Sequence, residues 1–234
     1  MSLSASQHRT LVIMAKAPRS GTVKTRLAQS LSSSAVTALY CCLLRDTVAL
    51  AKSLRGVTIA VVCPEPDKNE LADFLGSGIE IRAQEGDGLA AGLTSVFAHF
   101  TAVAGQRVIA FNSDSPHLAA SVLEGAFESL TAHDVVIGPT HDGGYYLVGA
   151  KASHPSLFAG DGMGTRSALD RLISRTRALE LPTAFIEPFY DIDVAEDLIR
   201  LSRELELAPQ RAPRTAAWFK EWKQAIAHLK PGAL

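Results

Sequence analysis

The chain has 234 residues, of which 47% are hydrophobic and 20% are charged. This length suits one α/β domain with a substantial core, and the composition is that of a folded globular protein and excludes a disordered chain. The formal net charge is −1, so no overall basic field draws the protein to nucleic acid or to an anionic membrane. We therefore expect any anionic ligand to be held by a local cluster of cations.

Cysteine content and the first residues bear on the location of the protein. Cys41, Cys42 and Cys63 have no disulfide or zinc spacing, and we expect them to be small buried side chains in a reducing compartment. Residues 1–9 are polar and lack the apolar stretch of a signal peptide, and no apolar run approaches the ~20 residues needed to span a bilayer. We therefore expect a cytoplasmic protein without a membrane span.

Short apolar runs alternate with longer helical patterns along most of the chain. The runs that predict strands are 11–15, 57–63, 79–83, 107–111, 134–138, 145–149 and 183–187. The helical patterns extend from Ser32 through Leu54 and over 89–102, 118–130, 165–179, 195–206 and about 215–230. We expect Thr165 to cap its helix, and residues 208–214, with two prolines, to form a linker.

This alternation predicts a single domain over residues 1–234, with a core of about 10–206. Its architecture is expected to be a three-layer α/β/α sandwich around a mixed but mainly parallel sheet. The run 145–149 follows 134–138 too closely for a crossover helix, so we expect that strand to be antiparallel. In such sheets ligands bind beyond the carboxyl ends of the strands, so the loops there are the candidate site.

The first of these loops, residues 16–27, is basic. It has four cations within eleven residues, and we expect it to enter a helix. Backbone N–H groups at a helix start attract anions, and Lys16, Lys24 and Arg26 add charges and a bidentate fork for phosphate oxygens. The loop matches neither the Walker A nor the dinucleotide-binding pattern. The alternative is a solvated basic helix start without a ligand.

Aspartates follow two later strands. Asp114 comes after the strand 107–111, just before a helix that we expect Pro116 to begin. Its carboxylate suits Mg²⁺ or Mn²⁺ beside substrate phosphates, although an Asp-Ser-Pro turn explains it equally well. Asp191 and Asp193 alternate, so in an extended segment only one of them faces a given direction. We expect Asp193 to join Asp114 in clamping one metal ion, or to cap the following helix.

Two glycine-containing loops complete the candidate site. Gly88 and Leu89 begin a helix that we expect to contact the base of a nucleotide. The other loop is expected to line an acceptor pocket, with a tight hairpin as the alternative. The residues assigned to that pocket are Asp142, Gly143, Gly144 and Tyr145.

Taken together, these loops resemble a known family. The segments that carry the resemblance are MAKAPRSGTVKTRLA, FNSDSPHL, DVVIGPTHDGGYYLVG and FYDIDVAEDL. They look like the bacterial glycosyltransferase-A-like transferases often labelled radical-SAM/selenodomain-associated, over residues 10 to about 201. The resemblance implies the nucleotide-diphospho-sugar transferase (GT-A) fold, a Rossmann-like α/β/α sandwich.

More distantly, the sequence is similar to phospholactate and molybdenum-cofactor guanylyltransferases. In those enzymes a basic loop binds the triphosphate, an Asp-x-Pro motif holds the metal, and an Ile-Asp-Thr-Pro-Glu-Asp motif ends the fold. The matching positions here are Lys16, Gly21, Lys24, Arg26, Asp114 and Asp193. The chain departs from that pattern with Ala90 in place of asparagine and with Val194-Ala195 in place of Thr-Pro.

We interpret the chain as a metal-dependent transferase that uses a nucleotide. The favoured reaction is nucleotidyl transfer from a nucleoside triphosphate to a small acceptor that bears a phosphate or carboxylate. Glycosyl transfer from a nucleotide-sugar is the alternative, and a non-catalytic nucleotide-binding module, consistent with Ala90, Val194 and Ala195, is the third reading. The partners are then a nucleotide and a small molecule, without nucleic acid, and a homodimer is the assembly considered.

The assigned site residues fall into three groups. The nucleotide-binding residues are Ala15, Lys16, Gly21, Thr22, Lys24, Arg26, Gln84, Gly88 and Leu89. The catalytic residues are Lys24, Arg26 and Asp114. The ligands of Mg²⁺ or Mn²⁺ are Asp114 and Asp193.

Overall fold

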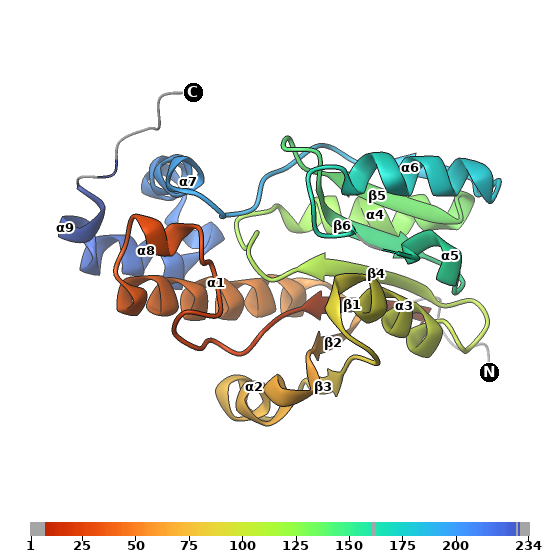
Figure 1. The fold of residues 1–234 in the computed structure, drawn as a ribbon, viewed down its shortest axis with the longest axis horizontal. Coiled ribbons are helices and arrows are strands. Elements are labelled where there is room, and N and C mark those ends of the chain that lie inside the picture. The colour runs from red at the N-terminus through yellow and green to blue at the C-terminus, as the bar shows by residue number, and fades with distance from the viewer. Residues whose placement is uncertain (1–7, 161, 228, 230–234) are drawn as a thin grey trace.

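A computed structural model describes residues 8–160, 162–227 and 229 of the chain (Figure 1). Its seven strands form one sheet in the order β3-β2-β1-β4-β6-β5-β7. The strands are β1 Arg9–Met14, β2 Thr58–Cys63, β3 Glu80–Ala83, β4 Arg107–Asn112, β5 Val135–Pro139, β6 Tyr145–Ala150 and β7 Thr183–Phe185. β6 is antiparallel to both β4 and β5, and the other pairs are parallel. The predicted mixed, mainly parallel sheet with an antiparallel strand over 145–149 is therefore confirmed.

Helices cover both faces of this sheet. They are α1 Ser33–Ser53, α2 Lys68–Leu75, α3 Gly88–Phe100, α4 Ala120–Ala132, α5 Pro155–Phe158, α6 Ala168–Ala178, α7 Ala195–Leu207, α8 Pro213–Glu221 and α9 Lys223–Ile226. Successive strand residues point to opposite faces. On β1, Leu11 and Ile13 pack with α1, α2 and α4, whereas Val12 packs with α3, α5 and α6. The structure thus has the three predicted layers.

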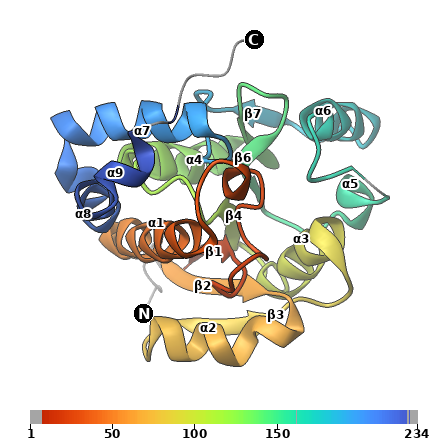
Figure 2. The ribbon, with the colours of Figure 1, turned by 60° about the vertical axis from the view of Figure 1, so that its left-hand side comes forward.

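A third apolar cluster extends the fold beyond α1. The outer face of α1, including Leu39 and Leu43, packs against α7 and α8. Figure 2 shows α7, α8 and α9 gathered beside α1, away from α3 and α5. Trp218 and Trp222 stack with ring centroids 6.1 Å apart, which agrees with the packing role that their spacing predicts. This cluster also includes Ile192, so it anchors the segment that carries the late aspartates.

α1 is apolar along much of its length. Among the described residues, this one helix is long and apolar enough to cross a membrane by length and composition, contrary to the expectation that no segment approaches this limit. Its window is 56% buried inside the protein, as in the core helix of a folded domain. It also carries Cys41 and Cys42, which are only half-buried, whereas Cys63 is fully buried as expected.

Two predicted helix starts near the candidate site are wrong. The basic loop leads only into a short 3₁₀ turn over Leu27–Gln29 and not directly into a helix. The predicted start of the long helix at Ser32 is confirmed, because the Ser32 side chain caps α1 by accepting a hydrogen bond from the N–H of Ala35 at 3.3 Å. Pro116 lies in a turn, and α4 begins at Ala120. In this turn the Ser115 hydroxyl donates to the carbonyl of Tyr190 at 3.1 Å, which ties the turn to the segment of the late aspartates.

Other boundaries also differ from the predictions. Thr165 does not cap α6, because its hydroxyl donates to the carbonyl of Gly162 and the helix begins after Ser167. The predicted linker 208–214 already contains the start of α8, where the N–H of Thr215 donates to buried Asp46 on α1 at 2.8 Å. The expected terminal helix over about 215–230 divides at Trp222 into α8 and α9. Residues 1–7 of the predicted polar start, and residues 228 and 230 of the predicted terminal helix, lie outside the described residues.

Candidate active site

A cavity of about 600 Å³ lies beyond the carboxyl ends of β1, β2, β3 and β4. Its lining includes most of the residues predicted to bind the nucleotide: Ala15, Lys16, Thr22, Lys24, Arg26, Gln84, Gly88 and Leu89. Asp114 and Asp193, the two predicted metal ligands, line it as well. Gly21 does not line the cavity and is exposed at the tip of the basic loop. The parallel strands therefore bring the basic loop and the aspartates to one edge, as predicted.

Lys24 joins the basic loop to the aspartates. Buried Val23 and Leu27 anchor the loop on either side of it, and the Lys24 backbone has a φ of 49°. The Lys24 side chain is only 5% exposed, and its Nζ donates to Asp193 Oδ1 at 2.8 Å and also to Asp114 Oδ2. Burial lowers the pKa of Lys24, but the two carboxylates outweigh burial and hold that pKa above its usual value. Lys24 therefore stays charged.

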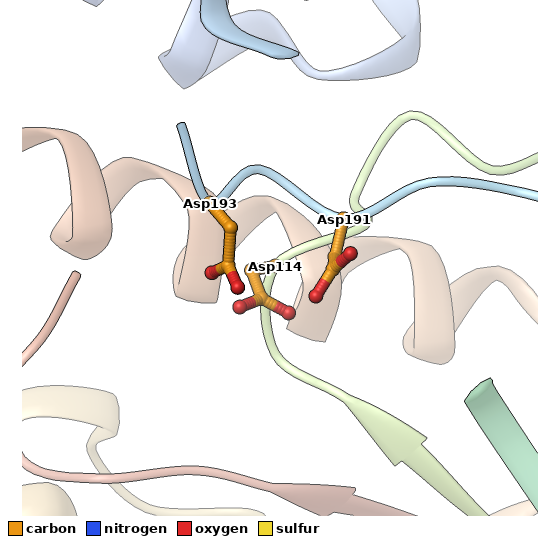
Figure 3. A group of neighbouring side chains, drawn as sticks. All are labelled: Asp114, Asp191 and Asp193. Carbon is orange, nitrogen blue, oxygen red and sulfur yellow. The ribbon is translucent and has the colours of Figure 1, made fainter. Parts of the chain in front are cut away.

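Three carboxylates meet at this point. Asp114, Asp191 and Asp193 each offer an oxygen, and these oxygens lie within 4.8 Å of one another. Figure 3 shows Asp191 and Asp193 on one segment, with their carboxylates beside that of Asp114. Sequence reasoning missed Asp191, and the expectation that only one of the two late aspartates faces the site is wrong. Their segment is not part of a strand, so the strict alternation of strand side chains does not apply.

The Asp197 side chain shapes this segment. Its Oδ2 accepts hydrogen bonds from the N–H groups of Asp193 and Val194, both at 3.0 Å. Asp197, from inside the first turn of α7, thereby binds the free N–H groups before the helix, and Asp193 is not the capping residue. The Asp193 carboxylate is consequently free to face Lys24.

The surroundings of the two late aspartates shift their pKa values in opposite directions. Burial, and then repulsion from Asp114 and Asp193, raises the pKa of Asp191 to about 7. Burial acts in the same direction on Asp193, but Lys24 and Arg26 outweigh it and lower the pKa of Asp193. Lys24 thus compensates part of the negative charge, and Asp191 remains the carboxylate with the least compensation.

The other cations of the basic loop have separate positions. Arg19 turns away from the cavity and binds Asp67 Oδ1 at 2.6 Å and Glu70 Oε2 at 2.5 Å. Lys16 is exposed on the cavity wall. Arg26 is also exposed, and its NH1 lies 3.4 Å from Asp193 Oδ2. Because Lys24 is engaged with the aspartates, Lys16 and Arg26 are the loop cations with the most freedom to meet an anion.

Tyr40 on α1 is a further site residue that the sequence did not indicate. Its hydroxyl accepts a hydrogen bond from the N–H of Lys16 at 3.1 Å and lies 3.2 Å from the Ser113 hydroxyl. Tyr40 is buried and lines the cavity. It therefore links the loop after β1 to the loop after β4, next to Asp114.

The predicted acceptor residues form the turn between β5 and β6. Asp142 Oδ1 accepts hydrogen bonds from the Thr140 hydroxyl at 2.6 Å and from the N–H of Gly144 at 3.2 Å. A side chain at Gly143 would meet the carbonyl oxygen of Arg166 at 2.1 Å. None of the four assigned residues lines the cavity. The hairpin alternative describes the local structure, and the acceptor role remains a prediction.

Solved structures with the same arrangement of strands and helices identify the class of fold. A candidate nucleotide-diphospho-sugar transferase from Desulfovibrio desulfuricans G20 has a TM-score of 0.87, with 24% identity over 97% of this chain and 100% of its own. 4-Diphosphocytidyl-2C-methyl-D-erythritol synthase from Anaerococcus prevotii has a TM-score of 0.55 with 14% identity, over 88% of this chain and 100% of its own. Mycobacterium tuberculosis Rv0371C in complex with manganese has a TM-score of 0.51 with 17% identity, over 83% and 97%. The protein has the nucleotide-diphospho-sugar transferase fold, as the resemblance implied.

The family follows from the sequence itself. The model of the DUF2064 family, described as an uncharacterized protein conserved in bacteria, matches residues 47–165, just over half of the chain. The protein belongs to this family. No curated protein matches the sequence.

Proposed function

We propose that the protein is a metal-dependent transferase that uses a nucleotide, and that its reaction is nucleotidyl transfer to a small acceptor bearing a phosphate or carboxylate. The observation that carries the proposal is that Lys24 joins a basic loop to a cluster of three aspartates, two of which, Asp114 and Asp193, line the same cavity as the loop. Cations that bind phosphate and carboxylates that bind a divalent ion are the parts a nucleotide site needs.

The aspartates fit a hard divalent cation. Asp114, Asp191 and Asp193 supply closely spaced carboxylate oxygens, the ligand type that Mg²⁺ and Mn²⁺ prefer. The Lys24 ammonium holds two of these carboxylates together, so the cluster already accommodates one cation. We therefore add Asp191 to the two ligands expected from the sequence. When bound, the ion would offset negative charge on the phosphoryl oxygens.

The side chains around this point would act by positioning and by electrostatic stabilisation. Lys16 and Arg26 line the cavity and would hold phosphate oxygens. When Asp114 and Asp193 bind a metal ion, the Lys24 ammonium would be free to turn from them to the same phosphates. Tyr40 would keep the two loops at a constant separation through its hydrogen bonds to Lys16 and Ser113.

Glycosyl transfer from a nucleotide-sugar is the second candidate, and one observation favours it. Arg19 binds Asp67 and Glu70 on the far side of the loop, so the positive charge at the cavity is smaller than the sequence suggests. A diphosphate whose charge is already offset by a metal needs fewer cations than a triphosphate. The high structural similarity to the Desulfovibrio protein is consistent with either reaction.

Calorimetry with Mn²⁺ would separate the two candidates. We would titrate the full chain with nucleoside triphosphates and with nucleotide-sugars, with and without the metal. Metal-dependent binding of a triphosphate, followed by pyrophosphate release with a panel of phosphate and carboxylate acceptors, would support nucleotidyl transfer. Selective binding of a nucleotide-sugar, with release of the diphosphate, would support glycosyl transfer. Binding without turnover would support a non-catalytic module, and a complete lack of binding would contradict a nucleotide site.

A further inference from the structure

We infer that Asp67 is a positioning residue of the phosphate site. Its carboxylate holds the peptide unit between Lys16 and Ala17, and so fixes the start of the basic loop before a ligand binds. This inference rests on the proposed function, because it names what shapes the phosphate-binding part of the same site. It applies to a triphosphate and to a nucleotide-sugar alike, since both present a diphosphate.

Asp67 belongs to a different part of the chain from the loop that it contacts. It ends a 3₁₀ turn over Glu65–Asp67, which follows β2, and it directly precedes α2. Its Oδ2 accepts a hydrogen bond from the N–H of Ala17 at 2.9 Å, and its Oδ1 accepts one from Arg19 NH1 at 2.6 Å. The side chain is only 10% exposed and does not line the cavity. Any effect of Asp67 on a ligand in the cavity therefore passes through the basic loop.

The Asp67 carboxylate does not serve its own helix. The residue occupies the N-cap position of α2, where an aspartate ordinarily accepts a hydrogen bond from the first turn. Among the described residues, its side chain makes no such bond to α2. Its two oxygens instead accept from residues 50 and 48 positions earlier in the chain. Helix capping therefore does not account for this aspartate.

Two side chains hold the opposite ends of one peptide unit. The carbonyl oxygen of Lys16 accepts a hydrogen bond from the Tyr40 hydroxyl at 3.2 Å, and the N–H of Ala17 donates to Asp67. Because a peptide unit is planar and its C=O and N–H point in opposite directions, these two bonds fix its orientation. This unit carries Lys16, whose side chain lines the cavity. Tyr40 and Asp67 together therefore determine where Lys16 stands at the phosphate site.

Loss of Asp67 would leave the N–H of Ala17 without this partner. Ala17 is 1% exposed, and a buried backbone N–H without a hydrogen bond is costly. The peptide unit would have to turn toward water, and Lys16 would turn with it. A ligand would then have to order this part of the loop as it binds, which lowers affinity.

The contact between Asp67 and Arg19 contributes less. Arg19 is 39% exposed, and it keeps Glu70 Oε2 at 2.5 Å and the carbonyl of Pro66 at 2.9 Å as further partners. Exposed ion pairs contribute little because water and salt screen them. We therefore assign the positioning effect to the hydrogen bond between Asp67 and Ala17, so that Arg19→Ala should leave ligand affinity unchanged.

Calorimetry on the full chain tests this role with a probe that has no base or sugar. The protein is titrated with inorganic pyrophosphate in the presence of Mg²⁺ and, separately, with Mn²⁺ alone, at a temperature where every variant is folded. Asp67→Ala is expected to bind pyrophosphate about tenfold more weakly, since ordering the backbone of one residue corresponds to roughly this factor. Its affinity for Mn²⁺ alone is expected to stay unchanged, because the aspartate cluster keeps its three carboxylates.

Asp67→Asn is the conservative variant. Its amide oxygen can still accept the hydrogen bond from the buried N–H of Ala17, while Arg19 keeps its other partners. This variant should therefore recover most of the pyrophosphate affinity. A loss in Asp67→Asn as large as that in Asp67→Ala would overturn the inference, because the charge would then matter rather than the bond to Ala17.

Asp46→Ala is the matched control. Asp46 is fully buried, and its Oδ2 accepts a hydrogen bond from the N–H of Thr215 at 2.8 Å, so it makes the same type of contact away from the cavity. Both alanine variants are expected to lower the midpoint of thermal unfolding, but Asp46→Ala should keep the wild-type affinity for pyrophosphate. Unchanged affinity in Asp67→Ala, or an equal loss in the two alanine variants, would overturn the inference and leave the proposed function intact. Failure of the wild type to bind pyrophosphate would instead contradict the proposed function, and the inference with it.

Amide hydrogen exchange on the wild type gives a second measurement that does not depend on the folding of any variant. In the ligand-free protein the N–H of Ala17 should be protected, as that of Thr215 is, and pyrophosphate should add little protection. Fast exchange at Ala17 that slows only after pyrophosphate is added would overturn the inference, because the ligand rather than Asp67 would then order the peptide unit.

Discussion

The ammonium nitrogen of Lys24 lies 2.8 Å from Oδ1 of Asp193, across 169 residues of sequence. The sequence assigns these residues to different tasks, phosphate binding and metal binding. In the structure they form one ion pair around the buried ammonium of Lys24, with Asp193 38% exposed, and Asp114 joins it. A cation that stabilises a carboxylate cluster competes with any second cation for the same oxygens, and this competition makes the site testable.

Removal of Lys24 should destabilise the metal-free protein, and a divalent ion should restore part of the lost stability. We expect Lys24→Met to lower the free energy of unfolding by about 1.5–3 kcal/mol, the scale for hydrogen bonds to charged groups, because Asp193 is 38% exposed and the pair is only partly buried. Mn²⁺ should restore more stability to this variant than to the wild type, as measured by denaturant unfolding with and without the ion. Arg26→Met, which breaks an exposed pair, should cost less than ~1 kcal/mol. An equal loss in the two variants would argue against the role given to Lys24.

Arg26 should instead matter for the ligand. We expect Arg26→Ala to weaken nucleotide binding by about 1.5–3 kcal/mol, the scale for losing a hydrogen bond to a charged group. Calorimetry with the nucleotide that binds best measures this change. Arg19→Ala is the control, because Arg19 faces α2 rather than the cavity and should leave the affinity unchanged. Unchanged affinity in Arg26→Ala would remove Arg26 from the phosphate site.

Metal affinity should depend on pH through Asp191. Its pKa is raised to about 7, so below that pH the ion must displace a proton. We expect Mn²⁺ affinity to rise about tenfold per pH unit up to about 7 and then to level off. In the metal-free protein, protonated Asp191 favours the folded state. This contribution to stability is fully present below the unfolded pKa and is lost as the pH rises through about 7.

Calorimetric titrations with Mn²⁺ between pH 6 and 8 would check this prediction. Asp191→Asn should bind the ion more weakly and with a flatter pH profile. Asp142→Asn makes the same change outside the cavity and should keep the wild-type profile. A pH profile in Asp191→Asn that matches the wild type would show that another group releases the proton.

His117 should make the fold sensitive to acid. Its ring is buried between Phe189 and Tyr190, with both ring nitrogens unpaired among the described residues. Burial, and then the charges of Arg211 and Arg200, lowers the pKa of His117 to about 3. Because the folded pKa lies below the unfolded one, this histidine's contribution to stability is present above about pH 6.5 and is lost as the pH falls toward 3.

Urea unfolding at pH 7 and pH 5 measures this effect. We expect the wild type to lose about 2 kcal/mol more than His117→Phe between these values, at ~1.4 kcal/mol per pH unit below 6.5. His141→Gln, which changes an exposed histidine, should behave as the wild type. Equal pH dependence in His117→Phe and the wild type would mean that the pKa of His117 is the same in the folded and unfolded states, which would contradict the lowered pKa.

Gly143 should be required for the hairpin next to the site. Its φ is 90°, and an added Cβ would meet the carbonyl oxygen of Arg166 at 2.1 Å. We expect Gly143→Ala to lower the unfolding free energy by at least about 1–3 kcal/mol. Gly125 on α4 has open space around it, so Gly125→Ala should raise stability by up to ~1 kcal/mol. Thermal unfolding of the two variants provides the comparison, and equal stability would contradict the close contact.

Sequence alone determined the architecture and most of the cavity. Continuous apolar runs such as 11–15 mark buried strands because burial on both faces selects for them. Since parallel strands end at a common edge, the positions of Lys24, Asp114 and Gly88 after such strands predict that they lie around one site. The order of the strands along the chain, with few residues between 134–138 and 145–149, also identifies the antiparallel strand.

Only the tertiary structure decided which charges meet. Asp191 joins the cluster on a segment that Asp197 holds through the N–H groups of Asp193 and Val194, and a pattern of alternating residues does not encode these contacts. Arg19 is withdrawn from the cavity by Asp67 and Glu70 on another element. Lys24 turns to the aspartates because burial makes an unpaired ammonium costly. Residue type and spacing predict the chemistry that a loop offers, whereas the partner of each charge depends on contacts between segments far apart in the chain.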